Sequence, residues 1–270
     1  MKTKSVLIVI SLIAIATAGI YYYNNQGSTE PDLTEKFFHY QQLDKIYPYS
    51  SEKYEIKQYS GFHLAYNEEH EQAAWTIYLL TGKHLSNPVC DRTDNFMPDT
   101  NITTGSAELS DYKRSGFDRG HLVPAGDMKW SETAMNESFY LSNMSPQRAK
   151  FNRGIWKKLE EKVRDIAEME DSIIVITGPV LKNINKHIGD NQVSVPEKYF
   201  KIIFDISQPD QGMIALLMNN EKSKESLESF CISVDELEAE TGIDFFRSMD
   251  DGMEDIFEKS CPEYLVNYLR

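Results

Sequence analysis

The chain has 270 residues, 41% of them hydrophobic, which is enough for a sizeable core and excludes wholesale disorder. This length fits one globular domain, or two at most. The formal net charge of -14 argues against a nucleic-acid partner unless the basic residues are gathered in one place. Residues 112–164 hold 11 Lys and Arg against 6 Asp and Glu, whereas the rest of the chain holds 17 basic and 36 acidic residues. A basic segment therefore lies inside an acidic protein, although a solvated helix face would show the same charge pattern.

Residues 1–23 predict an export signal or an N-terminal anchor. Lys2 and Lys4 come first, an apolar stretch follows from Ser5 to Ile20, and Ala16-Thr17-Ala18 has the form of a cleavage site. An uncleaved anchor is the alternative, because Tyr21-Tyr22-Tyr23 extends the apolar run toward membrane-spanning length. We therefore expect an exported protein, secreted or periplasmic after cleavage, which contacts a membrane only if the segment stays uncleaved.

The remainder of the chain predicts an α+β fold with a largely antiparallel sheet. Residues 24–55 are expected to be a linker or N-terminal extension, and residues 56–270 the folded domain. Strands and helices alternate without a regular βαβ repeat, which favours antiparallel pairing. The expected strands are 62–66 and 74–80, joined as a hairpin, and 172–177, 199–206 and 213–218; residues 81–116 are expected to be mostly loop.

Three helices are expected, at 152–167, 234–240 and near 254–259. The first has an apolar stripe at helical spacing, formed by Ile155, Leu159, Val163 and Ile166. The second has a start signal, since Ser233 and Glu236 fit a capping box, and a stop at Gly242.

The three cysteines cannot all pair within one chain. Cys231 and Cys261 share the C-terminal region, and in an exported protein a disulfide between them would tie the end of the chain to the body. Cys90 is then left over and expected to be buried. Since no C-x-x-C spacing exists, a zinc site is not predicted.

The segment Phe117 to Pro124 places an acid, a guanidinium and an imidazole around one glycine. Arg119 suits a phosphate, because its planar fork can bind two oxygens, and a neutral His121 can take a proton from water. Gly120 would allow a turn that aims both side chains at one point. The four residues D-R-G-H by themselves also fit an ordinary surface turn.

Downstream, Asn152 and Glu160 lie eight residues apart on the expected helix, rotated by roughly 80°. Both can therefore flank one site, and their oxygens are hard ligands that suit Mg²⁺. The alternative is that Asn152 is a helix N-cap and Glu160 a solvated charge.

Three elements together resemble the DNA/RNA non-specific endonuclease family, which has a ββα-metal site. They are DRGH at 118–121, LSNMSPQ at 141–147 and NRGIWKKLE at 152–160, and the spacing between them fits as well. The resemblance covers roughly residues 60 to 245. It implies a ββα-metal nuclease fold, with helices flanking a largely antiparallel central sheet, and hydrolysis of phosphodiester bonds in DNA and RNA.

The resemblance also implies roles for individual residues. His121 matches the general base, and Asn152 matches the one side chain that binds the metal directly. Glu160 matches a carboxylate that orients the water molecules around that metal. Asn143 matches an active-site Asn that supports the His and the metal site.

Two arginines match phosphate-binding positions. Arg119 is the Arg of DRGH, and Arg92 matches more loosely, through the spacing of Arg92, Phe96 and Asp99 ahead of that motif. The expected metal is Mg²⁺, with Mn²⁺ as a substitute. Since none of these groups reads a base edge, contact with DNA and RNA is expected through the phosphate backbone alone.

Two alternatives remain open at this point. The same site could act as a phosphodiesterase or pyrophosphatase on small nucleotides, which the acidic remainder of the chain favours slightly. A non-catalytic module that binds nucleic acid would not need His121, Asn152 and Glu160 at these spacings. The oligomeric state and the biological role are left open by the sequence.

Overall fold

The computed structural model describes residues 43–44, 46–206, 213–247 and 263–270. The expected N-terminal segment, the expected helix near 254–259 and Cys261 lie outside these residues. Within them, no helix has the length and apolar character needed to cross a membrane.

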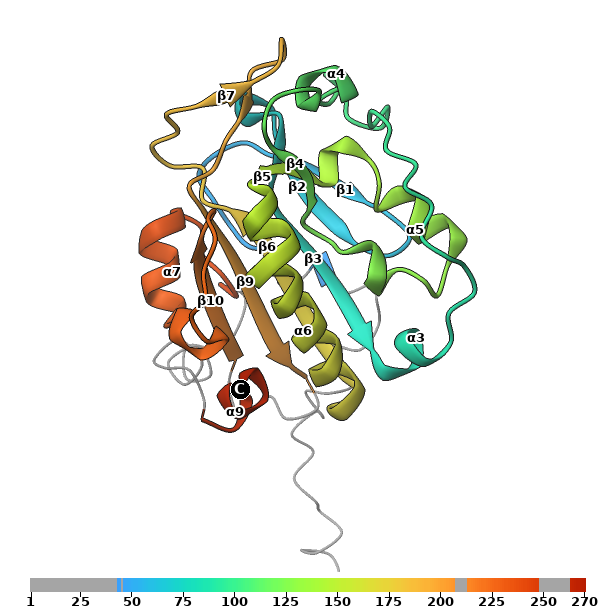
Figure 1. Cartoon of the computed structure of the whole chain (residues 1–270), viewed down its shortest axis with the longest axis vertical. Coiled ribbons are helices and arrows are strands. Elements are labelled where there is room, and N and C mark those ends of the chain that lie inside the picture. The colour runs from blue at the N-terminus through green and yellow to red at the C-terminus, as the bar shows by residue number, and fades with distance from the viewer. Residues whose placement is uncertain (1–42, 45, 207–212, 248–262) are drawn as a thin grey trace, which may run out of the picture. The chain divides into compact units, whose positions relative to one another are not determined.

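A seven-stranded sheet forms the centre of the fold (Figure 1). Its order is β1-β2-β3-β6-β9-β10-β11, and every neighbouring pair is antiparallel, as predicted. The central strands β6 and β9 are buried along nearly their whole length because both faces of the sheet are covered. The strands are β1 Glu55–Gln58, β2 His63–Asn67, β3 Gln72–Thr81, β6 Ser172–Pro179, β9 Lys198–Asp205, β10 Met213–Asn219 and β11 Cys231–Ile232.

The predicted hairpin is β2 and β3, joined through the 3-10 turn η2 (Glu68–His70). Two further strand pairs lie outside the central sheet: β4 (Asp118–His121) with β5 (Met144–Gln147), and β7 (His187–Ile188) with β8 (Val193–Ser194). The first of these pairs, here called the β4–β5 ribbon, carries two of the three sequence motifs.

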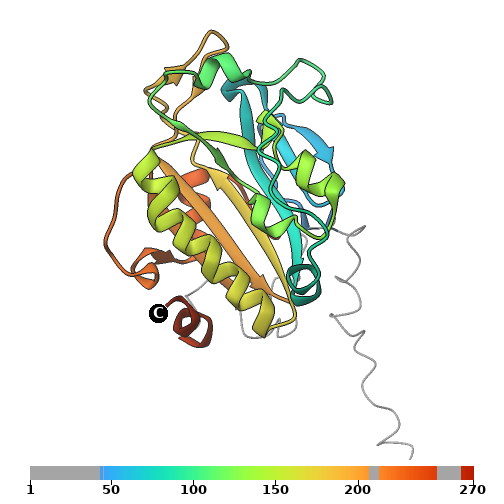
Figure 2. The same cartoon turned by 45° about the vertical axis from the view of Figure 1, so that its right-hand side comes forward.

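The predicted helix at 152–167 has two parts. A π-helical turn, η5 (Phe151–Trp156), leads into the regular helix α6 (Lys157–Met169), and Gly154 within η5 has a non-helical backbone (φ -112, ψ -112). The apolar stripe is buried as expected, and α6 lies along one face of the sheet over β3 and β6 (Figures 1 and 2). Helix and ribbon together hold the elements of the expected ββα unit.

The predicted helix at 234–240 is α7 (Val234–Thr241), beside β10. The capping box between Ser233 and Glu236 is formed, and Gly242 ends the helix at a positive φ of 75°. The sequence did not predict α9 (Glu263–Leu269), which contacts α6 and β10.

Short helical segments connect the strands. The loop expected over 81–116 contains two of them, α3 and α4. The segments are α3 Gly82–Ser86, α4 Leu109–Tyr112, η3 Ala125–Asp127, α5 Glu132–Glu137, η4 Leu141–Asn143 and η7 Leu227–Phe230.

Residues ahead of β1 pack against the domain. Leu43 and Ile46 are buried, and Tyr49 forms a backbone bridge with Asp244. The cysteines differ partly from expectation. Cys231 is disulfide-bonded, whereas Cys90 is free and only partly buried, because it lies in a surface loop.

Candidate active site

The DRGH motif is a strand, and the expectation of a turn at Gly120 is wrong. Asp118 pairs with Gln147 and His121 with Met144 along the β4–β5 ribbon. Since side chains two residues apart on a strand point to the same face, Arg119 and His121 reach one pocket without a turn.

Gly120 has a different function from the one expected. A Cβ at this position would lie 2.2 Å from the side chain of Gln147, its neighbour across the ribbon. The glycine is therefore required for close packing and not for a positive φ.

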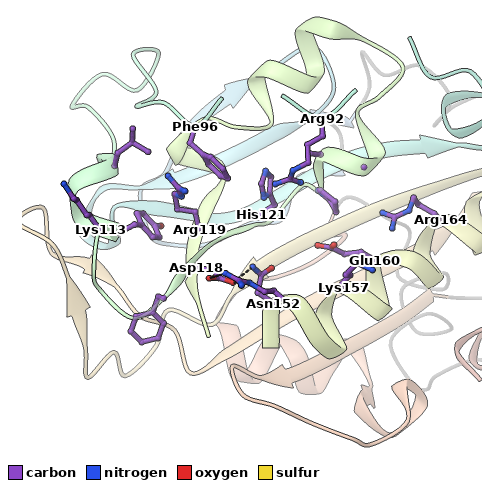
Figure 3. A pocket seen from close by; sticks show the side chains of 17 residues that line it. Arg92, Phe96, Lys113, Asp118, Arg119, His121, Asn152, Lys157, Glu160 and Arg164 are labelled. Carbon is purple, nitrogen blue, oxygen red and sulfur yellow. Dashed lines mark hydrogen bonds and ion pairs between the residues drawn. The ribbon is translucent and has the colours of Figure 1, made fainter. Parts of the chain in front are cut away.

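A pocket of about 770 Å³ gathers five of the six predicted site residues: Arg92, Arg119, His121, Asn152 and Glu160. Figure 3 shows His121 and the two arginines on one side of it, and Asn152 and Glu160 on the other. We call these sides the ribbon wall (Arg92, Arg119 and His121) and the helix wall (Asn152 and Glu160). Segments far apart in the sequence thus meet at one place.

Asn143, the sixth predicted residue, does not line this pocket. It is fully buried, and its side chain accepts a hydrogen bond from the Val123 backbone N–H and donates to the carbonyls of Val123 and Ser138. Its own carbonyl accepts from the N–H of Leu122, directly after His121. Asn143 therefore holds the backbone that follows the DRGH strand.

The His121 ring is buried between aromatic rings. Phe139 lies at 4.9 Å and Phe96 at 5.6 Å between ring centroids, and Nε2 is a buried atom without a hydrogen-bond partner among the described residues. Burial first, and then the charges of Arg92 and Arg119, lower the pKa of His121 from 6.5 to about 3. The ring is therefore neutral at neutral pH and able to accept a proton.

Both arginines of the ribbon wall stack on aromatic rings. The guanidinium of Arg119 lies 4.0 Å from the centroid of Phe96, and that of Arg92 lies 4.9 Å from Phe139. Arg92 also donates to Asp94, while Arg119 has no ion pair within the described residues. The stacked arginines make this wall suitable for an anion.

Asn152 is held by a carboxylate of the neighbouring ribbon. Its Nδ2 donates to Asp118 Oδ2 at 3.0 Å, and Arg153 donates to both oxygens of Asp118 at 2.8 and 2.7 Å. Because the amide nitrogen is engaged by Asp118, the amide oxygen is left for a cation. No sequence pattern around Asp118 predicted this contact.

A buried charge network lies beneath Glu160. Arg164 donates to Asp127 at 2.9 Å, Tyr78 donates to the other oxygen of Asp127 at 2.7 Å, and Lys201 donates to Thr177 at 2.5 Å. Burial raises the pKa of Glu160, and the nearby charge of Lys201 opposes that rise.

Sequence reasoning missed this network. Its one signal was Lys201, a charged residue inside the otherwise apolar run of β9. A lysine in that position must be paired or hydrogen-bonded, which pointed to buried acidic or polar partners.

The donor atoms of the pocket fit a hard divalent cation. The helix wall supplies an amide oxygen and a carboxylate, and no thiolate lines the pocket. The described part of the chain has no cluster of three or more His, Cys, Asp and Glu that could hold a metal. A cation here would therefore rely on few protein ligands and on water, as Mg²⁺ commonly does.

Comparisons with known proteins identify the family and the fold of this chain. The family "DNA/RNA non-specific endonuclease" matches residues 41–252. The solved EndoG/EndoGI complex, described as a mechanism of EndoG inhibition, contains a chain similar to this one. The TM-score is 0.72 at 28% identity, over 79% of this chain and 93% of that one. This similarity agrees with the α+β fold and the ββα-metal architecture that the sequence predicted.

Curated relatives are nucleases. "Endonuclease G, mitochondrial" of Caenorhabditis elegans is 34% identical over 72% of this chain and 69% of its own length. "Nuclease 1, mitochondrial" of Schizosaccharomyces pombe is 30% identical over 91% and 87%. "Nuclease EXOG, mitochondrial" of Danio rerio is 32% identical over 72% of this chain, which spans only 62% of that relative.

The names of these relatives place them in mitochondria and give no support to the expected secretion of this protein.

The residues matched by the family model include the β4–β5 ribbon, η5 and the central sheet, so the similarity covers the whole pocket. The chain belongs to the DNA/RNA non-specific endonuclease family.

Proposed function

We propose that this protein is a Mg²⁺-dependent endonuclease that hydrolyses phosphodiester bonds of DNA and RNA, with His121 as its general base. The observation that carries the proposal is the pairing of a neutral, buried imidazole with oxygen donors across one pocket. Hydrolysis needs a base for the attacking water, cations for the phosphate oxygens and a way to stabilise the leaving oxygen. The two walls supply groups for the first two needs.

On the ribbon wall, the neutral imidazole of His121 takes a proton from the attacking water. Arg119 and Arg92 bind the oxygens of the scissile phosphate. The aromatic rings on which they stack, Phe96 and Phe139 respectively, hold the two guanidinium groups in place. Asn143 positions the backbone after His121 and does not touch substrate.

On the helix wall, the amide oxygen of Asn152 would hold the metal, and Asp118 fixes the orientation of that amide. The carboxylate of Glu160 would orient water molecules bound to it. Members of this family typically use a divalent metal. When bound, such an ion neutralises charge on the phosphate and acts as a Lewis acid. The hard oxygen donors favour Mg²⁺, with Mn²⁺ as a substitute.

The substrate is expected to be long nucleic acid of either sugar type. The pocket is also lined by Lys113 and by Arg153 and Lys157, which pair with Asp118 and Glu161 and keep exposed side chains. Such cations bind phosphates regardless of sequence. The alternative substrates, small nucleotide esters, would not need so wide a basic rim.

We also propose that residues 1–23 direct or anchor the chain. They contain no Arg, and their apolar run lacks the amphipathic, Arg-rich pattern of a mitochondrial transit peptide, which favours export. The nuclease domain begins ahead of residue 56 in this proposal, since Leu43 and Ile46 are buried. The N-terminus of the mature protein, determined by mass spectrometry, tests the first part: an intact Met1 would favour an anchor.

The function is tested by incubating purified protein with plasmid DNA, with RNA and with a dinucleotide ester, in Mg²⁺ and in excess chelator. We expect both polymers to be cut in Mg²⁺ and neither in chelator. Cleavage of the dinucleotide alone would make the protein a small-nucleotide phosphodiesterase instead. Full nicking activity in chelator would exclude the proposed metal requirement.

A further inference from the structure

The β4–β5 ribbon ends beside a second set of cations that the proposed mechanism does not use. Asp118 and Gln147 are the last pair of the ribbon, and the residues just beyond them are Phe117 and Arg148. Phe117 lines the catalytic pocket, whereas Arg148 lines a separate cavity of about 300 Å³. The end of the ribbon at Asp118 and Gln147 therefore lies between the catalytic pocket and the second cavity.

Two exposed cations lie at the Phe117 ring. The Lys186 Nζ atom is 4.7 Å from the ring centroid, and the Arg148 guanidinium carbon is 5.8 Å from it. Both cations line the second cavity. Glu197 and Glu221 also line it, but in the described part of the chain neither forms an ion pair with them. The positive charges of Arg148 and Lys186 are therefore available to an anion.

The backbone that carries these cations is fixed. The Arg148 N–H donates to the side chain of Asn220, a buried residue that also donates to the carbonyls of Pro146 and Pro196. The Lys186 carbonyl accepts from the N–H of Val195. The cavity is thus preformed, and only the ends of the two long side chains are free to adjust.

We propose that Phe117, Arg148 and Lys186 bind the nucleotide that neighbours the cleaved phosphate. Arg148 and Lys186 bind its phosphate, and the Phe117 ring packs against its base or sugar at the boundary between the two cavities. Cations that follow the backbone, combined with an aromatic platform, bind single strands without regard to sequence. This subsite rests on the proposed function, because it extends the substrate path out of the same pocket.

The subsite is tested first by binding, in chelator so that nothing is cut. The affinity for a single-stranded oligonucleotide that covers both cavities is measured by fluorescence anisotropy at several salt concentrations. Each phosphate contact contributes about 0.7 to the slope of log affinity against log salt for a single strand. Because both side chains bind the same phosphate, the double variant Arg148→Gln/Lys186→Gln should lower that slope by about 0.7.

The matched control is Lys53→Gln/Lys83→Gln, which removes the same charge from exposed positions that line neither cavity. It should keep the slope of the unmodified protein. If both double variants lose the same amount of slope, the loss reflects the overall charge of the protein and the proposal is wrong. The proposal is also wrong if the slope of the Arg148 and Lys186 variant does not change.

Phe117→Leu tests the ring, because Leu keeps apolar bulk but offers no aromatic face. For Phe117→Leu we expect at least about a fivefold loss of affinity, which is the low end of the range for one lost base–aromatic contact. The slope of log affinity against log salt should not change. Phe117→Trp should restore it. Wild-type affinity of the Leu variant would exclude the ring from the subsite, and circular dichroism confirms that each variant is folded.

A cleavage readout separates this inference from the function itself. In Mg²⁺, the ratio of kcat/KM for the long oligonucleotide to kcat/KM for the dinucleotide ester should fall about tenfold in the Arg148 and Lys186 variant, as expected when charged contacts are lost. If the unmodified protein cuts neither substrate, the proposed function fails, while the binding slopes still report on the subsite. If it cuts both and the ratio does not change, the subsite fails alone.

Discussion

The two walls of the pocket have opposite electrostatic character. On the ribbon wall, burial and two arginines lower the pKa of His121, so the wall disfavours another positive charge and suits an anion. On the helix wall, burial raises the pKa of Glu160, so the wall disfavours further negative charge unless a cation is present. In the proposed mechanism, phosphate and metal are therefore held by separate walls, with the reacting phosphorus between them.

The largest effect is expected from His121→Ala, which removes the base from the ribbon wall. The turnover rate should fall by about 10²–10⁴-fold. DNA affinity in chelator should remain, since a neutral imidazole adds little to the binding of a polyanion. Plasmid nicking and anisotropy measure the two quantities, and near-normal turnover would show that His121 is not the base.

Asn152→Ala should lower turnover at low Mg²⁺ by about a hundredfold, the upper scale for disturbing groups around a metal. Asp118→Asn keeps Asn152 but weakens the acceptor that orients it, so a smaller loss is expected there. Turnover measured at fixed low Mg²⁺ compares the two. A larger loss for Asp118→Asn than for Asn152→Ala would contradict direct metal binding by Asn152.

Arg119→Gln should lower kcat/KM by about tenfold, in keeping with the loss of one charged hydrogen bond. Both binding and turnover should suffer, because the phosphate is charged in the ground state and in the transition state. Arg119→Lys is the matched control: it keeps the charge but loses the planar fork, and should lie between. An Arg119→Gln enzyme with unchanged KM would argue against ground-state phosphate binding.

The smallest effect is a shift of the pH profile in Arg92→Gln. His121 acts as a base only when unprotonated, so its activity is present above its pKa and lost as the pH falls through it. Removing Arg92 takes away a charge that lowers this pKa, so the acid limb of kcat/KM should move to higher pH, by up to about one unit. The pKa of Glu160 moves in the same direction, because Arg92 favours its ionised form.

Lys53→Gln is the control for this pH shift, since it makes the same charge change far from both walls in sequence and lines neither cavity. Its acid limb should match that of the unmodified protein. A movement to lower pH in Arg92→Gln would contradict the electrostatic account of the ribbon wall.

The sequence predicted the central elements because their signals are local. Alternation and apolar runs predicted β2, β3, β6, β9 and β10, and helical spacing predicted α6. The strand character of DRGH was missed, because Gly120 looks like a turn residue until its close approach to Gln147 is visible. That approach brings together two positions 27 residues apart in the chain, which no local pattern contains.

The same reason explains the residues that sequence reasoning left out. Asp118 holds Asn152 only because the ribbon and η5 meet in space. The network of Lys201, Asp127 and Arg164 joins a strand, a turn and a helix, and only the isolated charge in β9 hinted at it.

The most direct test of the two-wall account is a Mg²⁺ titration of turnover for His121→Ala and Asn152→Ala side by side. If Asn152 binds the metal, as proposed, rising Mg²⁺ should recover much of the turnover of Asn152→Ala, with a raised half-saturating concentration. If His121 is the base, as proposed, no Mg²⁺ concentration should recover His121→Ala, whose half-saturating concentration should match that of the unmodified protein. Recovery of His121→Ala but not of Asn152→Ala would contradict the assignment of base and metal to separate walls.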